Sequence, residues 1–128
     1  MTKVICSEDC GNAPKKALLK EVHIAFAEND AAFILENVTD DIRWNIIGDK
    51  LIQGKSAVAE AIEKMKDEKA EELTINNIIT HGKTAAVDGS TKLASGKTVA
   101  FCDVYGFDGH GKNAKIKEMT SYVIALVT

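Results

Sequence analysis

The sequence has 128 residues, with 16 basic and 19 acidic side chains and a formal net charge of −3. This length predicts one domain built around a single core. The charge balance offers no concentrated positive potential, so we expect neither a nucleic-acid partner nor binding to an anionic membrane. No stretch approaches the roughly 18 apolar residues of a membrane span, and no charged and apolar leader opens the sequence, which favours a cytoplasmic protein.

The cysteine pattern argues against a secreted disulfide framework. The sequence contains only three cysteines, Cys6, Cys10 and Cys102, and this odd number leads us to expect reduced thiols. Cys6 and Cys10 have no second pair downstream and would form at most half of a zinc site. We therefore expect no metal and no cofactor. Residues 1–12 are interpreted as an N-terminal tail that precedes a single domain over residues 13–128.

The first part of this domain has the spacing of an amphipathic helix. Asn12 is a suitable N-cap and Pro14 suits the first turn, while Asn29 and Asp30 end the helix. Apolar residues recur at three- and four-residue spacing and form one stripe: Leu18, Leu19, Val22, Ala25 and Phe26. His23 lies at the edge of the stripe, where it could be a hydrogen-bonded core residue or a catalytic one.

A short second helix, a strand and a third helix are expected next. Phe33, Ile34 and Val38 would pack the second helix onto the same core. In residues 42–46 the alternation turns Ile42, Trp44 and Ile46 inward. Two glycine-containing pairs, 48–49 and 53–54, predict a loop. Ser56 then caps a third helix whose buried ridge is expected to be Val58, Ile62 and Met65.

From Leu73 to the end of the chain the apolar period changes from about 3.6 to 2. Turns near residues 82, 96 and 108–111 separate four long strands, which predicts an antiparallel meander. Helices followed by a sheet indicate an α+β fold. A strongly curved sheet wrapped around three helices would leave an apolar pocket at its mouth.

The strand over residues 99–107 carries a carboxylate in an aromatic row. Phe101, Asp103, Tyr105 and Phe107 share one face of this strand. If Asp103 points inward, desolvation should raise its pKa. A protonated Asp103 could then donate a hydrogen bond to a ligand carbonyl. Alternatively, it stays ionised and pairs with His23 or a lysine in a structural role.

Four stretches carry a resemblance to a known family: 27–30 at the helix break, 44–48 at the strand end, 54–56 at the helix entry, and 103–111 around the glycine-rich turn. In this order they resemble the NTF2-like superfamily, in its SnoaL-like and ketosteroid-isomerase-like branch, from about residue 14 to residue 125. The resemblance implies a cone-shaped α+β barrel that usually dimerises through its sheet. It does not fix a reaction, because the fold hosts isomerases, cyclases, hydratases and binding proteins.

The isomerase branch implies three catalytic positions in this sequence. Its aspartate base corresponds to Ile46, or to Asn45 if the register slips by one, and its tyrosine corresponds to Val22. Neither Ile46 nor Asn45 accepts a proton as a carboxylate does. Only the second oxyanion donor of that branch, an aspartic acid kept neutral by an apolar site, has a counterpart here, which is Asp103. Ketosteroid isomerisation by the family mechanism is therefore not expected.

The predicted site combines Asp103 and His23 as candidate catalytic residues with a surrounding pocket. The pocket is predicted to be lined by Val22, Phe26, Trp44, Ile46, Phe101, Tyr105, Met119, Ser121 and Val123. Cys102 and Tyr122 would lie on the opposite face of the sheet, Tyr122 toward a partner sheet.

Three functions remain open from the sequence. The first is a pocket protein that binds an apolar or carbonyl-bearing ligand. The second is an isomerase, cyclase or hydratase in which Asp103 acts as the acid and His23 as its basic counterpart. The third is a dimeric scaffold with a filled interior. In each case the expected partner is a second copy of the chain, joined through the sheet.

Overall fold

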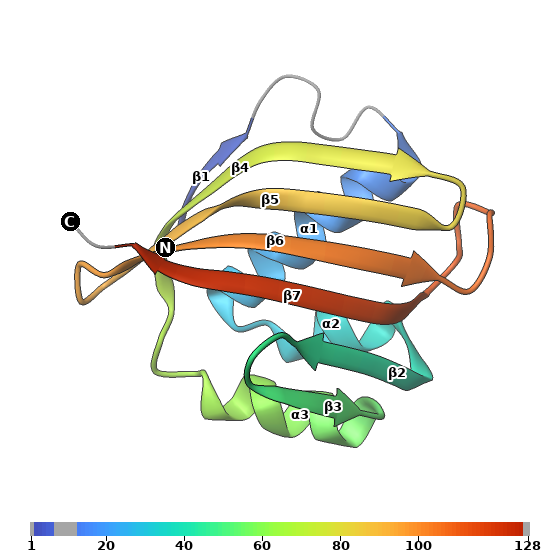
Figure 1. Ribbon diagram of the computed structural model, residues 1–128, viewed down its shortest axis with the longest axis horizontal. Helices are drawn as coiled ribbons and strands as arrows, with labels where there is room; N and C mark the ends of the chain where they lie inside the picture. Colours follow the sequence, from blue (N-terminus) through green and yellow to red (C-terminus); the bar gives the residue numbers. More distant parts are fainter. Residues whose placement is uncertain (1, 7–12, 127–128) are drawn as a thin grey trace.

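The computed structural model describes residues 2–6 and 13–126 and has the α+β architecture expected from the sequence. Its described part contains three helices and one seven-stranded sheet, with the strand order β1-β4-β5-β6-β7-β2-β3. Figure 1 shows α1 and α2 behind the central strands, so the helices cover one face of a curved, mostly antiparallel sheet. None of these helices is long and apolar enough to cross a membrane.

The first two helices are α1, Pro14–Glu28, and α2, Ala31–Glu36. Asn29 ends α1 in the left-handed conformation (φ 61°), where an asparagine is tolerated without glycine. Asp30 then caps α2 by accepting a hydrogen bond from the Phe33 N–H. At the start of α1 the N-cap is Ala13 rather than the expected Asn12, because Pro14 already occupies the first turn without needing a donor partner.

The segment between α2 and β4 forms β2, Val38–Ile46, β3, Lys50–Gln53, and α3, Lys55–Lys64. Three details differ from the sequence prediction. Val38 starts β2 instead of ending a helix. The predicted loop contains β3, which pairs antiparallel with β2. Gly54, with φ 88°, occupies the N-cap of α3 instead of Ser56, because the turn out of β3 needs a positive φ at that position.

The predicted meander is formed by β4, Ala70–His81, β5, Thr84–Leu93, β6, Thr98–Phe107, and β7, Ile116–Leu126. These strands pair antiparallel in sequence order, and β2 joins β7 in parallel. The pairing of β4 with β5 contains a register shift between Ile75 and Asn77. Gly89 lies opposite Ile75, where a Cβ would meet the Thr74 carbonyl oxygen at 1.9 Å. The close approach of the two strands at this bend therefore requires glycine there.

Part of the expected N-terminal tail forms a strand. Residues Lys3–Cys6 form β1, which pairs in parallel with β4. Residues 7–12, including Cys10, lie outside the described part of the chain. Cys6 is disulfide-bonded, so the expectation of reduced thiols is wrong for Cys6, whereas Cys102 is a free cysteine. An odd cysteine count excludes a complete set of pairs but still allows one bond.

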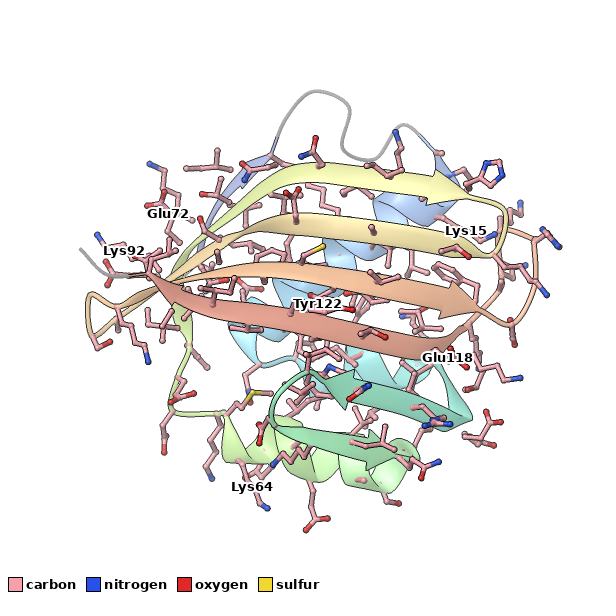
Figure 2. The ribbon with its side chains drawn as sticks, viewed as in Figure 1. Lys15, Lys64, Glu72, Lys92, Glu118 and Tyr122 are labelled. Carbon is pink, nitrogen blue, oxygen red and sulfur yellow. The ribbon has the colours of Figure 1, made fainter. Side chains whose placement is uncertain are left out.

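The two faces of the sheet differ in their surroundings. The inner face packs against the helices around Leu19, Val87 and Tyr105, each at most 1 % exposed. On the outer face Figure 2 shows Tyr122 projecting from β7, away from α1. Tyr122 and Ile124 are 46 % and 65 % exposed. The core thus occupies one face, and the other keeps large apolar side chains at the surface.

Candidate functional site

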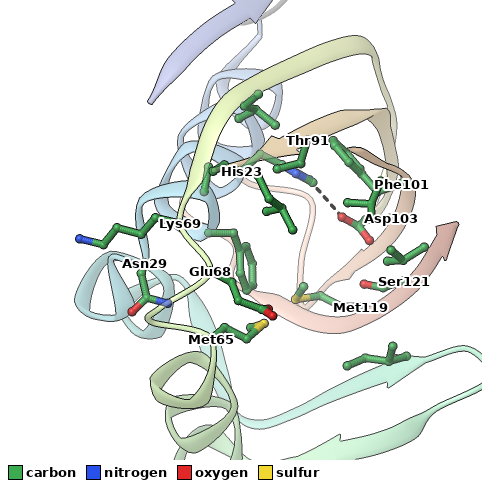
Figure 3. A pocket seen from close by; sticks show the side chains of 18 of the residues that line it. His23, Asn29, Met65, Glu68, Lys69, Thr91, Phe101, Asp103, Met119 and Ser121 are labelled. Atoms are coloured by element: carbon green, nitrogen blue, oxygen red, sulfur yellow. Dashed lines mark ion pairs between the residues drawn. The ribbon is translucent and has the colours of Figure 1, made fainter. Parts of the chain in front are cut away.

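A cavity of about 560 Å³ opens between the inner face of the sheet and the helices. Its walls come from α1, β2, the connection from α3 to β4, and strands β5, β6 and β7 (Figure 3). This volume lies in the range of small-molecule sites. The helix α1 packs against β4, and both elements contribute to the lining, α1 through His23 and β4 through Leu73.

Most of the predicted site residues meet at this cavity. Its lining includes nine of them: His23, Phe26, Trp44, Ile46, Phe101, Asp103, Met119, Ser121 and Val123. They come from four separate elements, α1, β2, β6 and β7. The strand register brings these residues together, because Asp103 pairs with Ser121 across β6 and β7, and Trp44 pairs with Met119 across β2 and β7.

Val22 and Tyr105, both predicted for the pocket wall, are not among the residues that line this cavity. Val22 is 1 % exposed and belongs to the core, since it lies next to His23 on the helix and faces a different direction. Tyr105 is also 1 % exposed. Its hydroxyl oxygen lies 2.7 Å from Nε2 of His23, so Tyr105 supports His23 from the protein interior.

The sequence analysis missed the residues at the mouth of the cavity. The polar and charged lining residues that it did not predict are Asn29, Asp49, Glu68, Lys69, Thr91 and Lys97. Most of them belong to turns or irregular connections, whose position depends on tertiary packing and not on a local period. Val99 also lines the cavity, and the alternation that gave Phe101 and Asp103 could have identified it.

A chain of hydrogen bonds crosses the deep end of the cavity. The Trp44 indole N–H donates to Oγ of Ser121 at 2.8 Å. The Ser121 hydroxyl in turn hydrogen-bonds Asp103. Oδ2 of Asp103 lies 3.5 Å from Nε2 of His23, the contact drawn in Figure 3. Within the described residues, every buried side-chain nitrogen and oxygen atom has a hydrogen-bond partner.

Burial changes the protonation of these groups. Desolvation lowers the pKa of His23 from 6.5 to about 3, so the imidazole is neutral at physiological pH. Desolvation raises the pKa of Asp103 from 3.8 to about 6, against the opposing effect of the Ser121 hydrogen bond. The direction expected for Asp103 is confirmed. The contact between His23 and Asp103 therefore joins a neutral imidazole to a carboxyl group that titrates near pH 6.

Aromatic contacts fix the orientation of the same residues. The His23 ring stacks on Phe101 with a centroid distance of 4.9 Å and an interplanar angle of 18°. On the other side, Phe26 and Trp44 pack with their centroids 5.4 Å apart. The rings hold the imidazole and the indole in place, so the polar groups at the deep end have defined positions.

This arrangement can bind a ligand and exchange a proton at Asp103. Ile46 lines the cavity at the position that corresponds to the isomerase base, and it cannot accept a proton. Among residues 2–6 and 13–126, no three histidine, cysteine, aspartate or glutamate side chains are grouped so that they could hold a metal ion.

The fold and the cavity together define an α+β protein of the cone-shaped, pocket-bearing class. The SnoaL-like domain matches residues 19–119, and the chain belongs to this family. No match was found among curated proteins.

Solved structures share the fold. The chain is 28 % identical to an NTF2-like protein of unknown function from Cytophaga hutchinsonii, with a TM-score of 0.66 over 84 % of this chain and 97 % of that one. An NTF2-like protein of unknown function from Burkholderia xenovorans gives 16 % identity and a TM-score of 0.74, over 90 % and 86 % of the two chains. A Mycobacterium tuberculosis epoxide hydrolase of the LEH-like type gives 18 % and 0.69, over 84 % and 80 %. At this low identity, the last two comparisons show the fold alone.

Proposed function

We propose that this protein binds a small, mainly apolar molecule in the cavity and recognises one polar group of that molecule, such as a carbonyl, through Asp103. The observation that carries the proposal is the position of Asp103, which is 9 % exposed and forms part of the cavity wall. A buried carboxyl group is costly to the fold unless it has a compensating contact, and a ligand could supply such a contact. The apolar lining supports the proposal, because it favours the hydrocarbon part of a ligand.

Trp44 provides a direct test of binding. It is the single tryptophan of the sequence and lines the cavity, so its emission should change when a ligand enters. Native mass spectrometry of the purified protein should detect a co-purified small molecule, and the same molecule should alter Trp44 fluorescence when it is added back to stripped protein.

Two variants separate recognition from general structural effects. Asp103→Leu keeps a similar side-chain volume and removes both the charge and every hydrogen-bonding atom, and we expect it to weaken binding at least about tenfold. Asp88→Leu is the matched control, because Asp88 lies on β5 next to the same strand but faces away from the cavity. Unchanged binding in Asp103→Leu, or the failure to detect any bound small molecule, would contradict the proposal.

A second candidate is an acid–base enzyme of the isomerase, cyclase or hydratase type. The 3.5 Å contact between His23 and Asp103 favours it, because burial moves the two pKa values in opposite directions. His23 lies beside Asp103 and not across the cavity, so the two would act on the same side of a substrate. Turnover of the co-purified molecule, lost in Asp103→Asn and retained in Asp88→Asn, would decide for the enzyme.

A homodimer through the outer face of the sheet is also part of the proposal. Three exposed apolar side chains on β7 support it, namely Tyr122, Ile124 and Leu126, and Ile79 on β4 is 63 % exposed. Clusters of exposed apolar side chains on a sheet are typical of protein contacts.

A further inference from the structure

Asp103 lacks a cationic partner within the part of the chain that the structure describes. Among the described residues, the carboxyl group of Asp103 forms its ion-pair contact with His23. Burial keeps that imidazole uncharged at physiological pH. Lys69 lines the cavity, but its side chain points away from the centre (Figure 3). An ionised Asp103 is consequently a buried charge that no protein cation balances.

The neighbouring strand nevertheless stabilises the ionised form of this carboxyl group. Oγ of Ser121 accepts the Trp44 N–H, which leaves the hydroxyl proton of Ser121 for Asp103. A hydrogen bond donated to a carboxylate favours the anion and opposes the effect of burial. With a pKa of about 6, Asp103 is mostly ionised at neutral pH and acts there as a hydrogen-bond acceptor. A ligand carbonyl is also an acceptor, so it would first require Asp103 to take up a proton.

The aromatic lining of the cavity also favours a positively charged ligand group. Phe26, Trp44 and Phe101 all line the cavity that contains the Asp103 carboxyl group. The faces of aromatic rings attract cations, most strongly where water is excluded. A cavity that holds a carboxylate and is lined by aromatic rings is therefore a suitable environment for an organic ammonium group.

We propose that the ligand of this cavity is a hydrophobic amine, whose protonated nitrogen pairs with Asp103 and whose hydrocarbon part packs against Phe26, Trp44 and Phe101. This inference rests on the proposed function and specifies the chemical class of the ligand. The ammonium group supplies the missing positive charge and donates a hydrogen bond to the carboxylate. A free metal cation or ammonium ion has no hydrocarbon part to pack against the aromatic lining, so it would not replace the amine.

Three probes with one hydrocarbon cage test the ligand class: 2-aminoadamantane, 2-adamantanone and 2-adamantanol. They differ only in presenting an ammonium group, a carbonyl or a hydroxyl at the same carbon. Dissociation constants would be measured for the full chain by calorimetry and by Trp44 fluorescence at pH 7.5. We expect the amine to bind at least about tenfold more tightly than the ketone, with the alcohol between them.

The affinities for the amine and for the ketone should depend on pH in different ways. The amine stays protonated between pH 5 and pH 7.5, whereas Asp103 ionises over this range. The affinity for the amine should therefore rise with pH, and the affinity for the ketone should fall or stay constant. His23 faces Asp103 from α1 and Ser121 faces it from β7. The other charged residues that line the cavity are Asp49, Glu68, Lys69 and Lys97.

Variants connect the preference to Asp103. Asp103→Asn should abolish the preference for the amine over the ketone, and Asp88→Asn should keep it. Ser121→Ala removes the donor that favours the anion, so it should reduce amine binding at pH 7.5 more than ketone binding. Thermal unfolding verifies that each variant is folded.

The outcomes distinguish this inference from the proposed function. Equal or tighter binding of the ketone at pH 7.5 would overturn the amine while leaving a small-molecule site in place. A preference for the amine that persists in Asp103→Asn would also overturn it, since the ammonium would then be paired with another acid such as Glu68. If none of the three probes binds and no small molecule co-purifies, both the inference and the proposed function fail.

Discussion

Burial shifts the pKa values of His23 and Asp103 in opposite directions, and these shifts should be visible in the pH dependence of the stability of the protein. The pKa of Asp103 is raised in the fold from 3.8 to about 6, so the folded state holds this proton more tightly than the unfolded state. Its stabilising contribution is present at low pH and is lost as the pH rises from about 4 to about 6. The pKa of His23 is lowered from 6.5 to about 3, so its contribution is lost as the pH falls through that range.

Between pH 4 and pH 6 these two contributions nearly cancel in the wild type. Asp103→Asn removes the Asp103 contribution and keeps that of His23. The unfolding free energy of this variant, relative to that of the wild type, should therefore increase by ~1.4 kcal/mol for each unit of rising pH. His23→Gln should give the opposite slope. Urea unfolding at pH 4, 5 and 6 measures both, with Asp88→Asn as the control expected to follow the wild type. Parallel stability curves for Asp103→Asn and the wild type would show that Asp103 does not titrate as described.

At the scale of single residues the sequence identified Asp103 because it interrupts an aromatic row. It could not distinguish Asp103 from Tyr105, since alternation along a strand gives the face of a side chain but not its depth. Asp103 and Tyr105 share a face, yet Tyr105 is covered by His23 and Asp103 borders the cavity. The depth depends on which helix residue lies above each strand position, and this is a tertiary property.

Strand β5 contains the glycine on which the shape of the sheet depends. A Cβ at Gly89 would lie 1.9 Å from the backbone carbonyl oxygen of Thr74, so Gly89→Ala requires the backbone of β4 to move. We expect a loss of unfolding free energy of about 3 kcal/mol or more, together with weaker binding in the cavity. Thermal and urea unfolding measure the loss.

Gly111→Ala is the matched control for this prediction. Gly111 lies in the turn before β7, and a Cβ there would meet no atom within 4 Å. Its stability should stay within about 0.5 kcal/mol of the wild type. If Gly89→Ala were equally mild, β4 would not approach β5 as closely as described.

The long elements were predictable from period alone, and the short ones were not. The helix α1 and the strand β6 have enough repeats for their period to be recognised. The strands β1 and β3 have 4 residues each, and β3 lies between Gly48 and Gly54, which indicated a loop. They are strands because a longer neighbour supplies their hydrogen bonds, and no local pattern contains that information.

At the scale of the whole molecule, the outer face of the sheet predicts self-association. Ile124 is 65 % exposed on β7, so a charge there would be buried on dimerisation. We expect the wild type to sediment at about twice 13.8 kDa at micromolar concentration, and Ile124→Glu to sediment as a single chain. Ala94→Glu, in the exposed turn between β5 and β6, should leave the dimer intact. A wild type that sediments as a single chain of 13.8 kDa would contradict the prediction.

The short strands at the two ends of the strand order also affect how the protein behaves at high concentration. β1 and β3 are the outermost strands of the sheet, and each offers only 4 residues for further pairing. Each of them pairs with part of a longer neighbour, β1 with residues 72–75 of β4 and β3 with residues 43–46 of β2. A sheet with long, unpaired edges is a template for fibrils. These two short strands therefore shorten the stretches of β4 and β2 that are open to edge-to-edge pairing.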